Sequence, residues 1–545
     1  MLCCDRPSVV GFKGPDRFVG EEALTQYGRN TANTITALPS LLDATEAPSG
    51  ASYTMDGNGV SVDYALGEDA GPVTMEPELL LAMQLRKLAQ ESAVSRTIQD
   101  NFGADVSTSG YTLTLAVPSY FTPTQCAAAA DAAAIAGVPA ANVVPCHVAL
   151  AAQYTCRHAK ELVQLKPSKE GKDATPGDCR TILFVDCGAS QLTASVCDFT
   201  VESVVGGMVI KTRPKGTVRS MVCDATIGSA AVDVALFGHL AAECQEKHSE
   251  TPELGTRRGV RLLTQCEKAK KVLSSVAEAP IVCENLVEDT DVRFKVLRSD
   301  MEQLCKPMID RVHEVVASAI GAAGVALDAI HAVELVGGGS RAPMVQQAVA
   351  SAAGVEKSKL GFTLDSASAV AVGAACYGAG LSGIEITDST REPFVVGSDA
   401  TPGMGEAALA PLVVREQAMA SQTAASEAIG AARSELEGYL YEFRNTLDCG
   451  AHKELLDREK ISPMLDSAED WLYSEAADTA TLSDFQAKMS ELKTGIEEES
   501  VDYTLKVQEE KSKVEEELKA AEVRLTFLNF SVSPWFSFHA AAPAV

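Results

Sequence analysis

The stretch FVDCGASQLTASVCDF, residues 184–199, decides how the first part of the chain folds. An apolar run reaches Asp186, a small corner with Gly188 follows, and apolar and polar residues then alternate. This pattern predicts a strand, a tight turn and a second strand, with one carboxylate at the turn. Because Asp and Gly are ordinary turn residues, the stretch alone favours a plain hairpin over the alternative, a phosphate-binding hairpin whose acid serves a hydrated metal ion.

Composition and charge narrow the class of protein. The chain has 545 residues, of which 46% are apolar, and a formal net charge of −28. This length predicts about three or four domain-sized units, and the acidic excess argues against a nucleic-acid binder, since phosphate contacts need a basic surface. The 15 cysteines include no CxxC pair. Their spacing therefore predicts buried, reduced thiols in place of a zinc site or a thioredoxin-like motif.

Two Ala/Val-rich stretches bear on membrane association. Residues 126–152 and 315–337 carry several acidic residues and histidines, so they are expected to form buried helices and strands and not membrane spans. The first residues lack the long apolar core of a signal peptide. We therefore expect a cytoplasmic protein with no membrane partner.

The organisation of the chain changes along its length. Strand-like and helix-like segments alternate first, turn residues follow, and charged helix formers dominate the last part, which predicts an α/β unit followed by helices. In the helical part, five apolar side chains fall on one helix face: Leu436, Tyr439, Leu440, Phe443 and Leu447. Four regions are expected: an α/β unit at 1–382, a linker with one short strand at 383–415, a helical domain at 416–525 and a disordered tail at 526–545.

A second corner follows the hairpin along the chain. HAVELVGGGSRAP, residues 331–343, predicts a strand that ends in three glycines and then opens a helix. Backbone N–H groups at such a corner can approach an anion closely, because glycine has no side chain in the way. Between the two corners lies QCEKAKKVLSS, residues 265–275, which predicts a charged helix.

In this order of hairpin, helix and glycine corner, the chain resembles the 70-kDa heat-shock protein superfamily. VPSYFTPTQCAAAADAAAIAG (117–137) resembles a core segment of that family, and residues 436–447 and 465–493 resemble its helical lid. The resemblance implies an α/β, two-lobed, actin-like (ribonuclease H-like) ATPase domain followed by an α-helical lid. The hairpin at 184–199 looks more like that of the large 110-kDa branch, whose members are nucleotide-exchange partners and holdases.

The resemblance also implies a site for ATP or ADP with magnesium. Asp186 would hold a water molecule of the metal ion, and Gly188 would let the backbone approach the phosphates. The face that grips the ribose and adenine would consist of Glu267, Lys270, Lys271 and Ser274. The second lobe would contribute Gly337, Gly338 and Arg341. Without the resemblance, the cluster around Glu267 fits a solvated helix face equally well.

Several positions depart from the family pattern. The family's catalytic lysine falls at Pro39, its magnesium-linked glutamate at Cys146 and its hairpin threonine at Gln191. An acid expected within residues 365–375 falls at Ala367, two residues after an aspartate. Phosphoryl transfer depends on positioned cations and metal ligands, so we expect no catalytic residue, no useful hydrolysis and weak nucleotide binding.

Two segments of the family are also expected to be missing or short. Residues 5–35 resemble an early stretch of the family, and the family's first phosphate hairpin would precede them. Of the substrate-binding β-domain, only the beginning has a counterpart, in residues 384–396. We interpret the sequence as a truncated or spliced product, or an incomplete gene.

Three functions remain open from the sequence. The first is a non-hydrolysing co-chaperone of the 110-kDa type, which opens the nucleotide lobes of a hydrolysing 70-kDa partner and holds unfolded clients. The second is an ATP-driven foldase, or a non-functional fragment, depending on whether an upstream segment exists. The third is an actin-like or sugar-kinase-like relative, against which the lid motifs argue.

Overall fold

The computed structural model describes most of the chain: residues 7–48, 50–66, 69–90, 113–138, 140–165, 178–206, 209–287, 290–380, 385–398 and 403–515. The chain divides into two compact units, residues 1–420 and residues 421–545. Each is described by itself. The tail expected at 526–545 and nearly all of the loop before the hairpin lie outside the described residues.

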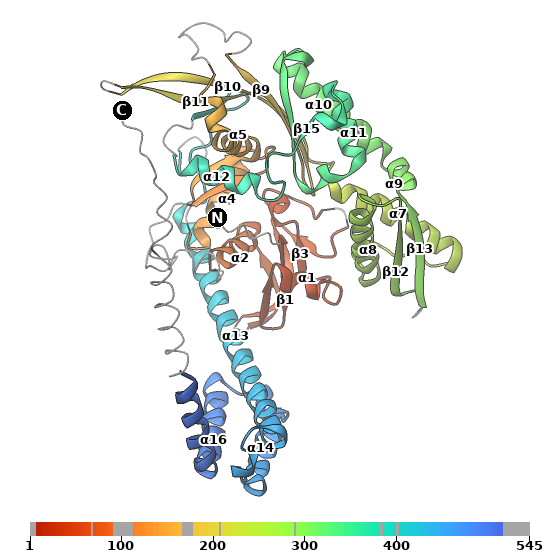
Figure 1. Ribbon diagram of the computed structural model, residues 1–545. Helices are drawn as coiled ribbons and strands as arrows, with labels where there is room; N and C mark the ends of the chain where they lie inside the picture. The colour runs from red at the N-terminus through yellow and green to blue at the C-terminus, as the bar shows by residue number, and fades with distance from the viewer. Residues whose placement is uncertain are drawn as a thin grey trace, which may run out of the picture. The chain divides into compact units, whose positions relative to one another are not determined.

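The first part of unit 1 combines three small sheets with short helices (Figure 1). The sheets have the strand orders β2-β1-β3, β4-β5-β6 and β7-β8. Their strands are β1 (Val9–Lys13), β2 (Asp16–Val19), β3 (Thr34–Thr36), β4 (Thr54–Asp56), β5 (Gly59–Leu66), β6 (Asp69–Met75), β7 (Leu113–Val117) and β8 (Ala140–Pro145). The helices are α1 (Glu21–Tyr27), η1 (Leu38–Leu41), α2 (Pro77–Gln90) and α4 (Pro123–Ile135).

The strand and helix predicted within residues 111–137 are confirmed as β7 and α4. Helix α4 begins where it does because Thr122 forms a capping box with Gln125: the Thr122 hydroxyl accepts from the Gln125 N–H, and the Gln125 side chain accepts from the Thr122 N–H. Such a box satisfies two backbone donors that a helix start would otherwise leave unpaired.

A six-stranded sheet forms the centre of unit 1. Its order is β15-β14-β9-β10-β11-β16, with β14 parallel to β9 and β10 antiparallel to both of its neighbours. The strands are β9 (Arg180–Cys187), β10 (Leu192–Gly206), β11 (Val209–Asp224), β14 (Ile330–Val336), β15 (Leu360–Gly361) and β16 (Glu385–Asp388). A separate antiparallel pair consists of β12 (Glu278–Val287) and β13 (Thr290–Leu297). The predicted hairpin is confirmed as β9 and β10.

Strand β9 is apolar throughout because helices cover both of its faces (Figure 1). Leu183 and Val185 point into one hydrophobic core, and Ile182 and Phe184 point into another. Successive side chains of a strand alternate between faces, so a strand buried on both sides shows a continuous apolar run. The helices and short 3₁₀ turns around this sheet are α5 (Cys146–Arg157), α6 (Ala159–Leu162), α7 (Ser229–His248), α8 (Arg257–Leu273), α9 (Arg298–Leu304), α10 (Lys306–Ala323), η2 (Leu327–Ala329), η3 (Gly338–Arg341), α11 (Pro343–Ala353), η4 (Lys357–Lys359) and α12 (Ala369–Gly378).

The short strand expected to open a separate β-domain belongs to this sheet. Strand β16 pairs in parallel with residues 215–218 of β11. A methyl group added at Gly216 would lie 2.7 Å from Ile386 Cδ1, so the glycine leaves the space that the isoleucine side chain occupies. Residues 385–388 are thus an edge strand of the six-stranded sheet, and the remnant of a β-domain expected within 383–415 stays a prediction.

Helix α13 (Glu406–Cys449) begins ten residues before the helical region predicted at 416. Its first part is bound into unit 1: Leu412 and Met419 join the hydrophobic core of the first three sheets. The carboxylate of Glu416 is fully buried and accepts from Arg17 Nη1 at 2.7 Å and from Arg86 Nε at 3.0 Å. Residues that the turn-rich sequence assigned to a linker are thus helical because this core and these two guanidinium groups fix them.

The helical unit contains the rest of α13 and the helices that follow it, namely η5 (Lys453–Leu455), α14 (Arg458–Leu472), α15 (Glu475–Asp478) and α16 (Leu482–Glu499). The predicted apolar face is confirmed, since Leu436, Leu440 and Leu447 are buried in one core, with Tyr439 and Phe443 packed against it. This core is closed by Leu465 and Leu472 of α14 and by side chains of α16.

Candidate functional site

The turn between β9 and β10 is held by the first turn of α7. The N–H groups of Ser229 and Ala230 donate to the carbonyls of Gly188 and Ala189, both at 2.9 Å. The Gly188 N–H in turn donates to the Gln191 carbonyl at 3.0 Å and closes the turn. Because the α7 amides are already used in this way, they stiffen the turn and do not act as free anion donors. A methyl group added at Gly188 would meet only the Gln191 carbonyl, at 3.7 Å. A ligand could therefore approach the backbone of the turn at this residue.

Asp186 is a buried carboxylate without a partner. The residue is 8% exposed, and among the described residues no hydrogen bond or ion pair reaches its side chain. Burial raises the pKa of Asp186 from 3.8 to about 6. A carboxylate that a fold keeps buried and unpaired is costly, and such groups cluster at functional sites.

The predicted glycine corner lies directly against this aspartate. Gly337 has a positive φ of 78°, and a methyl group added there would lie 2.6 Å from Asp186 Oδ1 and collide with the Cys187 carbonyl. Only glycine fits such a position. A methyl group at Gly338 would meet nothing within 4 Å, so its backbone is approachable. Beyond the corner, Arg341 Nη2 donates to Ser366 Oγ at 2.8 Å.

Helix α8 brings only one of its four predicted residues to the hairpin. Lys270 Nζ donates to the Ser229 carbonyl at 2.9 Å and to Asp233 Oδ2 at 2.6 Å, which ties it to the α7 turn that holds Gly188. Burial raises the pKa of Asp233 to about 6, against the opposing effect of Lys270. Sequence reasoning missed Asp233, because nothing in the sequence links it to a lysine 37 residues later.

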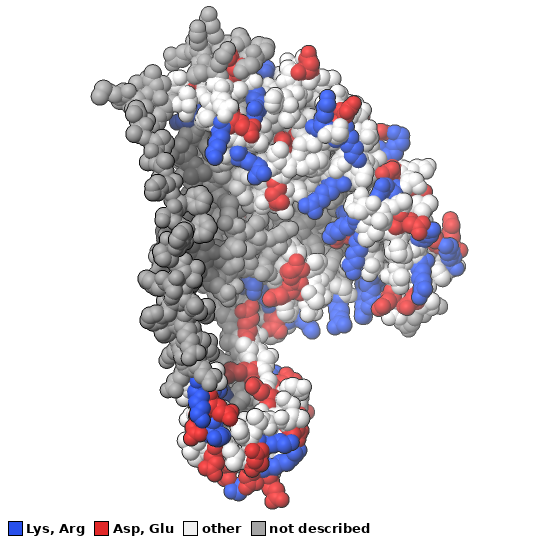
Figure 2. Space-filling model, viewed as in Figure 1, with Lys and Arg blue, Asp and Glu red and all other residues white. Residues whose placement is uncertain are grey.

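The other three predicted residues, two in α8 and Ser274 directly after its end, do not contact the hairpin in this way. Glu267 and Lys271 are about half exposed or more and pair with one another at 2.7 Å. The Ser274 hydroxyl donates to the Lys271 carbonyl at 2.6 Å. The spacing of these residues with Lys270 places all four on one side of a helix, so the predicted face exists, and its polar groups bond within the chain. Figure 2 shows basic side chains gathered over the part of unit 1 where α8 lies.

Three positions at which the chain departs from the family pattern lie in different elements of the fold. Cys146 begins α5, and burial together with the nearby Asp186 carboxylate raises the pKa of its thiol. Gln191 is buried, and its Oε1 accepts from Cys223 Sγ at 3.6 Å. Pro39 lies half-buried in η1. The thiols of Cys146, Cys187 and Cys223 thus lie near Asp186, and the positive charges of Arg391 and Lys270 act on the first two of them.

The last predicted position, Ala367, lies in a turn that an acid caps. Asp365 Oδ1 accepts from the N–H and hydroxyl of Ser368, at 2.8 and 2.7 Å, and from the Ala367 N–H at 3.2 Å. These bonds, led by that of the Ser368 hydroxyl, hold the pKa of Asp365 below its usual value. Asp365 therefore serves the start of α12 and does not replace the expected acid.

A buried histidine beside Cys146 was not predicted. His147 Nε2 lies 2.8 Å from Asp388 Oδ2, and its Nδ1 lies 3.0 Å from Ser119 Oγ. Although burial opposes its charge, the bonds from His147 and Thr390 hold the pKa of Asp388 below its usual value. This network fastens strand β16 to the N-terminal end of α5. A lone histidine after a cysteine gives no sequence signal for it.

The described residues offer neither a clustered metal site nor a membrane span. They contain no group of three or more His, Cys, Asp and Glu side chains placed to hold a metal ion. In the same part of the chain, no helix combines the length and the apolar character needed to cross a bilayer.

Comparison with known proteins identifies what the chain resembles. Residues 5–395 match the family model "Hsp70 protein". Heat shock 70 kDa protein 16 of Arabidopsis thaliana is 30% identical over 73% of this chain and 49% of its own length. Heat shock protein hsp88 of Neurospora crassa is 29% identical over 68% and 48%, and the 97 kDa heat shock protein of Strongylocentrotus purpuratus is 29% identical over 73% and 42%. The chain thus spans about half the length of these relatives or less, and the predicted α/β ATPase fold followed by a helical lid is confirmed.

Proposed function

Because the chain belongs to the Hsp70 protein family, and within it to the large 110-kDa branch, we propose that it is a co-chaperone. It acts as a nucleotide-exchange factor for a hydrolysing 70-kDa chaperone and as a holdase for unfolded clients. ATP or ADP with magnesium binds weakly, and hydrolysis is lost. The protein works in the cytoplasm, without nucleic-acid or membrane partners, which accords with its net charge of −28.

The surroundings of Asp186 carry this proposal. The Asp186 carboxylate suits a hydrated metal cation, whereas the open backbone at Gly188 and Gly338 and the lysines of α8 suit the anionic phosphates that would accompany it. The cations and the second acid that hydrolysis would need have no counterpart, since Pro39 and Cys146 occupy their positions in the family pattern. Each lost group of this kind costs about 2–4 kcal/mol of transition-state stabilisation. Binding without turnover is therefore the chemistry that these residues favour.

The residues present fit a magnesium nucleotide only in part. Asp186 would hold a water molecule of the metal ion, and the backbone at Gly188, Gly337 and Gly338 would face the phosphates. Lys270 would first have to leave Asp233, to which it is bound at 2.6 Å. The phosphates of a bound nucleotide would thus compete with Asp233 for Lys270 and with Glu267 for Lys271. This competition is a physical reason for weak affinity.

Exchange activity is tested by the release of labelled ADP from a hydrolysing 70-kDa chaperone, with and without this chain. We expect faster release at micromolar protein in low salt and a smaller effect in high salt, because a polar contact is screened. An unchanged release rate in low salt would contradict the exchange function and leave a passive holdase or a non-functional fragment.

Loss of hydrolysis is tested separately by steady-state phosphate release from the purified chain. We expect no release above that of the matched Asp186→Ala variant. Turnover that disappears in this variant would instead support the ATP-driven foldase. Nucleotide binding itself is followed by thermal unfolding, since any ligand of the folded state raises the melting temperature by mass action. We expect a small rise at millimolar ADP with magnesium.

A further inference from the structure

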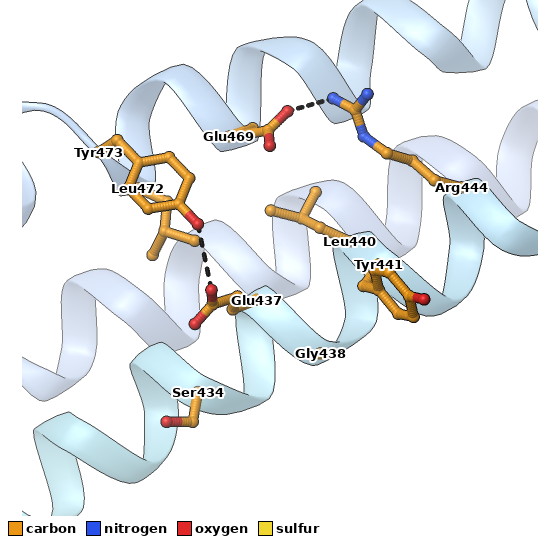
Figure 3. A pocket seen from close by; sticks show the side chains of 9 residues that line it. All are labelled: Ser434, Glu437, Gly438, Leu440, Tyr441, Arg444, Glu469, Leu472 and Tyr473. Carbon is orange, nitrogen blue, oxygen red and sulfur yellow. Dashed lines mark hydrogen bonds and ion pairs between the residues drawn. The ribbon is translucent and has the colours of Figure 1, made fainter.

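The helical unit carries a groove between α13 and α14. Its volume is about 430 Å³, and nine residues line it: Ser434, Glu437, Gly438, Leu440, Tyr441, Arg444, Glu469, Leu472 and Tyr473 (Figure 3). Leu440 and Leu472 supply apolar surface between its two ends, and both also belong to the hydrophobic core of the unit. The bottom of the groove is therefore held in place by the packing of this core.

Two tyrosines present their rings to solvent at this groove. Tyr441 is 79% exposed and Tyr473 is 64% exposed, the two highest values among the large apolar side chains of the described residues after 420. The Tyr473 hydroxyl donates to Glu437 Oε1 at 3.1 Å, which holds that ring in place (Figure 3). Exposed, oriented tyrosines are common anchors of protein interfaces, and their ring faces attract cations.

The charges at the groove favour a cationic ligand. Arg444, its one basic residue, is already paired with Glu469 and, at 2.7 Å, with Asp466. Two acids against one arginine leave excess negative charge there, and Glu437 adds more at the other end. The described part of the unit, residues 421–515, contains 22 acidic and 10 basic side chains, and Figure 2 shows acidic side chains interspersed with basic ones on its visible face. A second copy of this chain would be repelled by the same charge.

Gly438 borders the groove. It lies in the interior of α13, where glycine is less favourable than alanine. A methyl group added there would meet no atom within 4 Å. Packing within the unit therefore gives no reason for a glycine at this position, whereas a larger side chain would fill the groove.

We propose that this groove binds a basic segment of a partner polypeptide, with an arginine side chain between Tyr441 and Tyr473 and its charge facing Glu437 and Glu469. The guanidinium group stacks on aromatic rings and pairs with carboxylates at once. Neighbouring apolar residues of the segment contact the exposed rings of Tyr441 and Tyr473, above the buried Leu440 and Leu472. This proposal rests on the proposed holdase function and deepens it, since it names a site and a class of client segment whose binding requires neither a nucleotide nor a 70-kDa chaperone.

The test is fluorescence anisotropy of a short labelled peptide with one arginine among leucines, titrated with the full chain. A matched peptide with glutamate in place of arginine is the negative control. We expect the arginine peptide to bind and the glutamate peptide to fail, and binding to weaken as salt is raised. Equal binding of the two peptides would overturn the proposal.

Variants of the chain locate the binding. Gly438→Gln should fill the groove and weaken binding at least about tenfold, while its helix preference keeps or raises the melting temperature. Gly430→Gln is the matched control, because it changes an exposed glycine of the same helix that also has open space around it and lies outside the groove. Tyr441→Ser and Tyr473→Ser should each weaken binding about two- to fivefold. Unchanged affinity in Gly438→Gln would refute the assignment even if exchange activity were found.

Discussion

Replacing Asp186 with asparagine should stabilise the ligand-free protein at neutral pH. The change keeps the shape of the side chain and removes a buried charge that has no partner among the described residues. The pKa of the carboxyl rises from 3.8 in the unfolded chain to about 6 in the fold because of burial. Each pKa unit corresponds to about 1.4 kcal/mol, so the charged form costs the fold about 3 kcal/mol above pH 6. A buried asparagine amide keeps part of that desolvation cost, which leaves an expected gain of about 1–2 kcal/mol.

The pH dependence of this gain has a definite sign. A folded-state pKa above the unfolded value means that the folded protein binds the proton more readily. The wild-type contribution is therefore fully favourable below pH 3.8 and is lost as the pH rises through about 6. Asparagine does not titrate, so the difference between variant and wild type should be large at pH 7.5 and should vanish near pH 4.

Thermal unfolding at several pH values measures this difference. We expect Asp186→Asn to melt about 2–4 °C higher than wild type at pH 7.5. Asp224→Asn is the control of opposite sign: although burial opposes its charge, bonds from Thr226 and Arg311 hold the pKa of Asp224 below its usual value. That variant should melt lower at pH 7.5 and approach wild type in acid. A lower melting temperature for Asp186→Asn at pH 7.5 would refute the reasoning and indicate an undetected partner for the carboxylate.

Two further predictions concern packing. Gly337→Ala should lower the free energy of unfolding of unit 1 by at least about 2 kcal/mol, because a positive φ and the contact with Asp186 both exclude a side chain; in Gly338→Ala, where space is open, the loss measured by denaturant unfolding should be smaller, and equal losses would contradict the corner geometry. Leu465→Ala should destabilise the helical unit by about 2–5 kcal/mol, measured by hydrogen exchange of α14 and α16, whereas Leu455→Ala, which changes a partly exposed side chain, should leave exchange nearly unchanged.

The elements of the fold that sequence could predict are those with a regular local pattern. The hairpin at 184–199, the glycine corner and the apolar face of α13 each follow a period that a strand, turn or helix imposes. The beginning of α13 could not be predicted in this way. Residues 406–415 gain their helical structure from the core around Leu412, and residue 416 lies between two arginines that are distant in the sequence. Tertiary contacts of this kind do not produce a recognisable pattern in the local sequence.

The part of the candidate site that could be predicted consists of residues in local turns of the chain. Asp186 and Gly337 were expected at turns, and the structure places them against each other. The residues that bind Lys270 and those that surround Cys146 belong to other helices and strands. The sequence spacing of these residues does not predict their contacts. The roles of the α8 residues toward a nucleotide therefore remain predictions, and the displacement of Lys270 from Asp233 is the step on which they depend.

The pairing of β16 with β11 has a consequence for the order of events during synthesis. Val218 leaves the ribosome 170 residues before its partner Asp388, since the register pairs residues 215–218 with 385–388. At about 5–20 residues per second, the β11 edge is present for roughly 9–34 s before its final strand exists. A nascent strand edge is a hazard for wrong pairing, which a lysine on the edge reduces. Lys215, the first residue of the paired stretch, is such a lysine. Its charge disfavours wrong pairing at the exposed edge during synthesis, and in the folded protein it pairs with Glu385 at 2.8 Å.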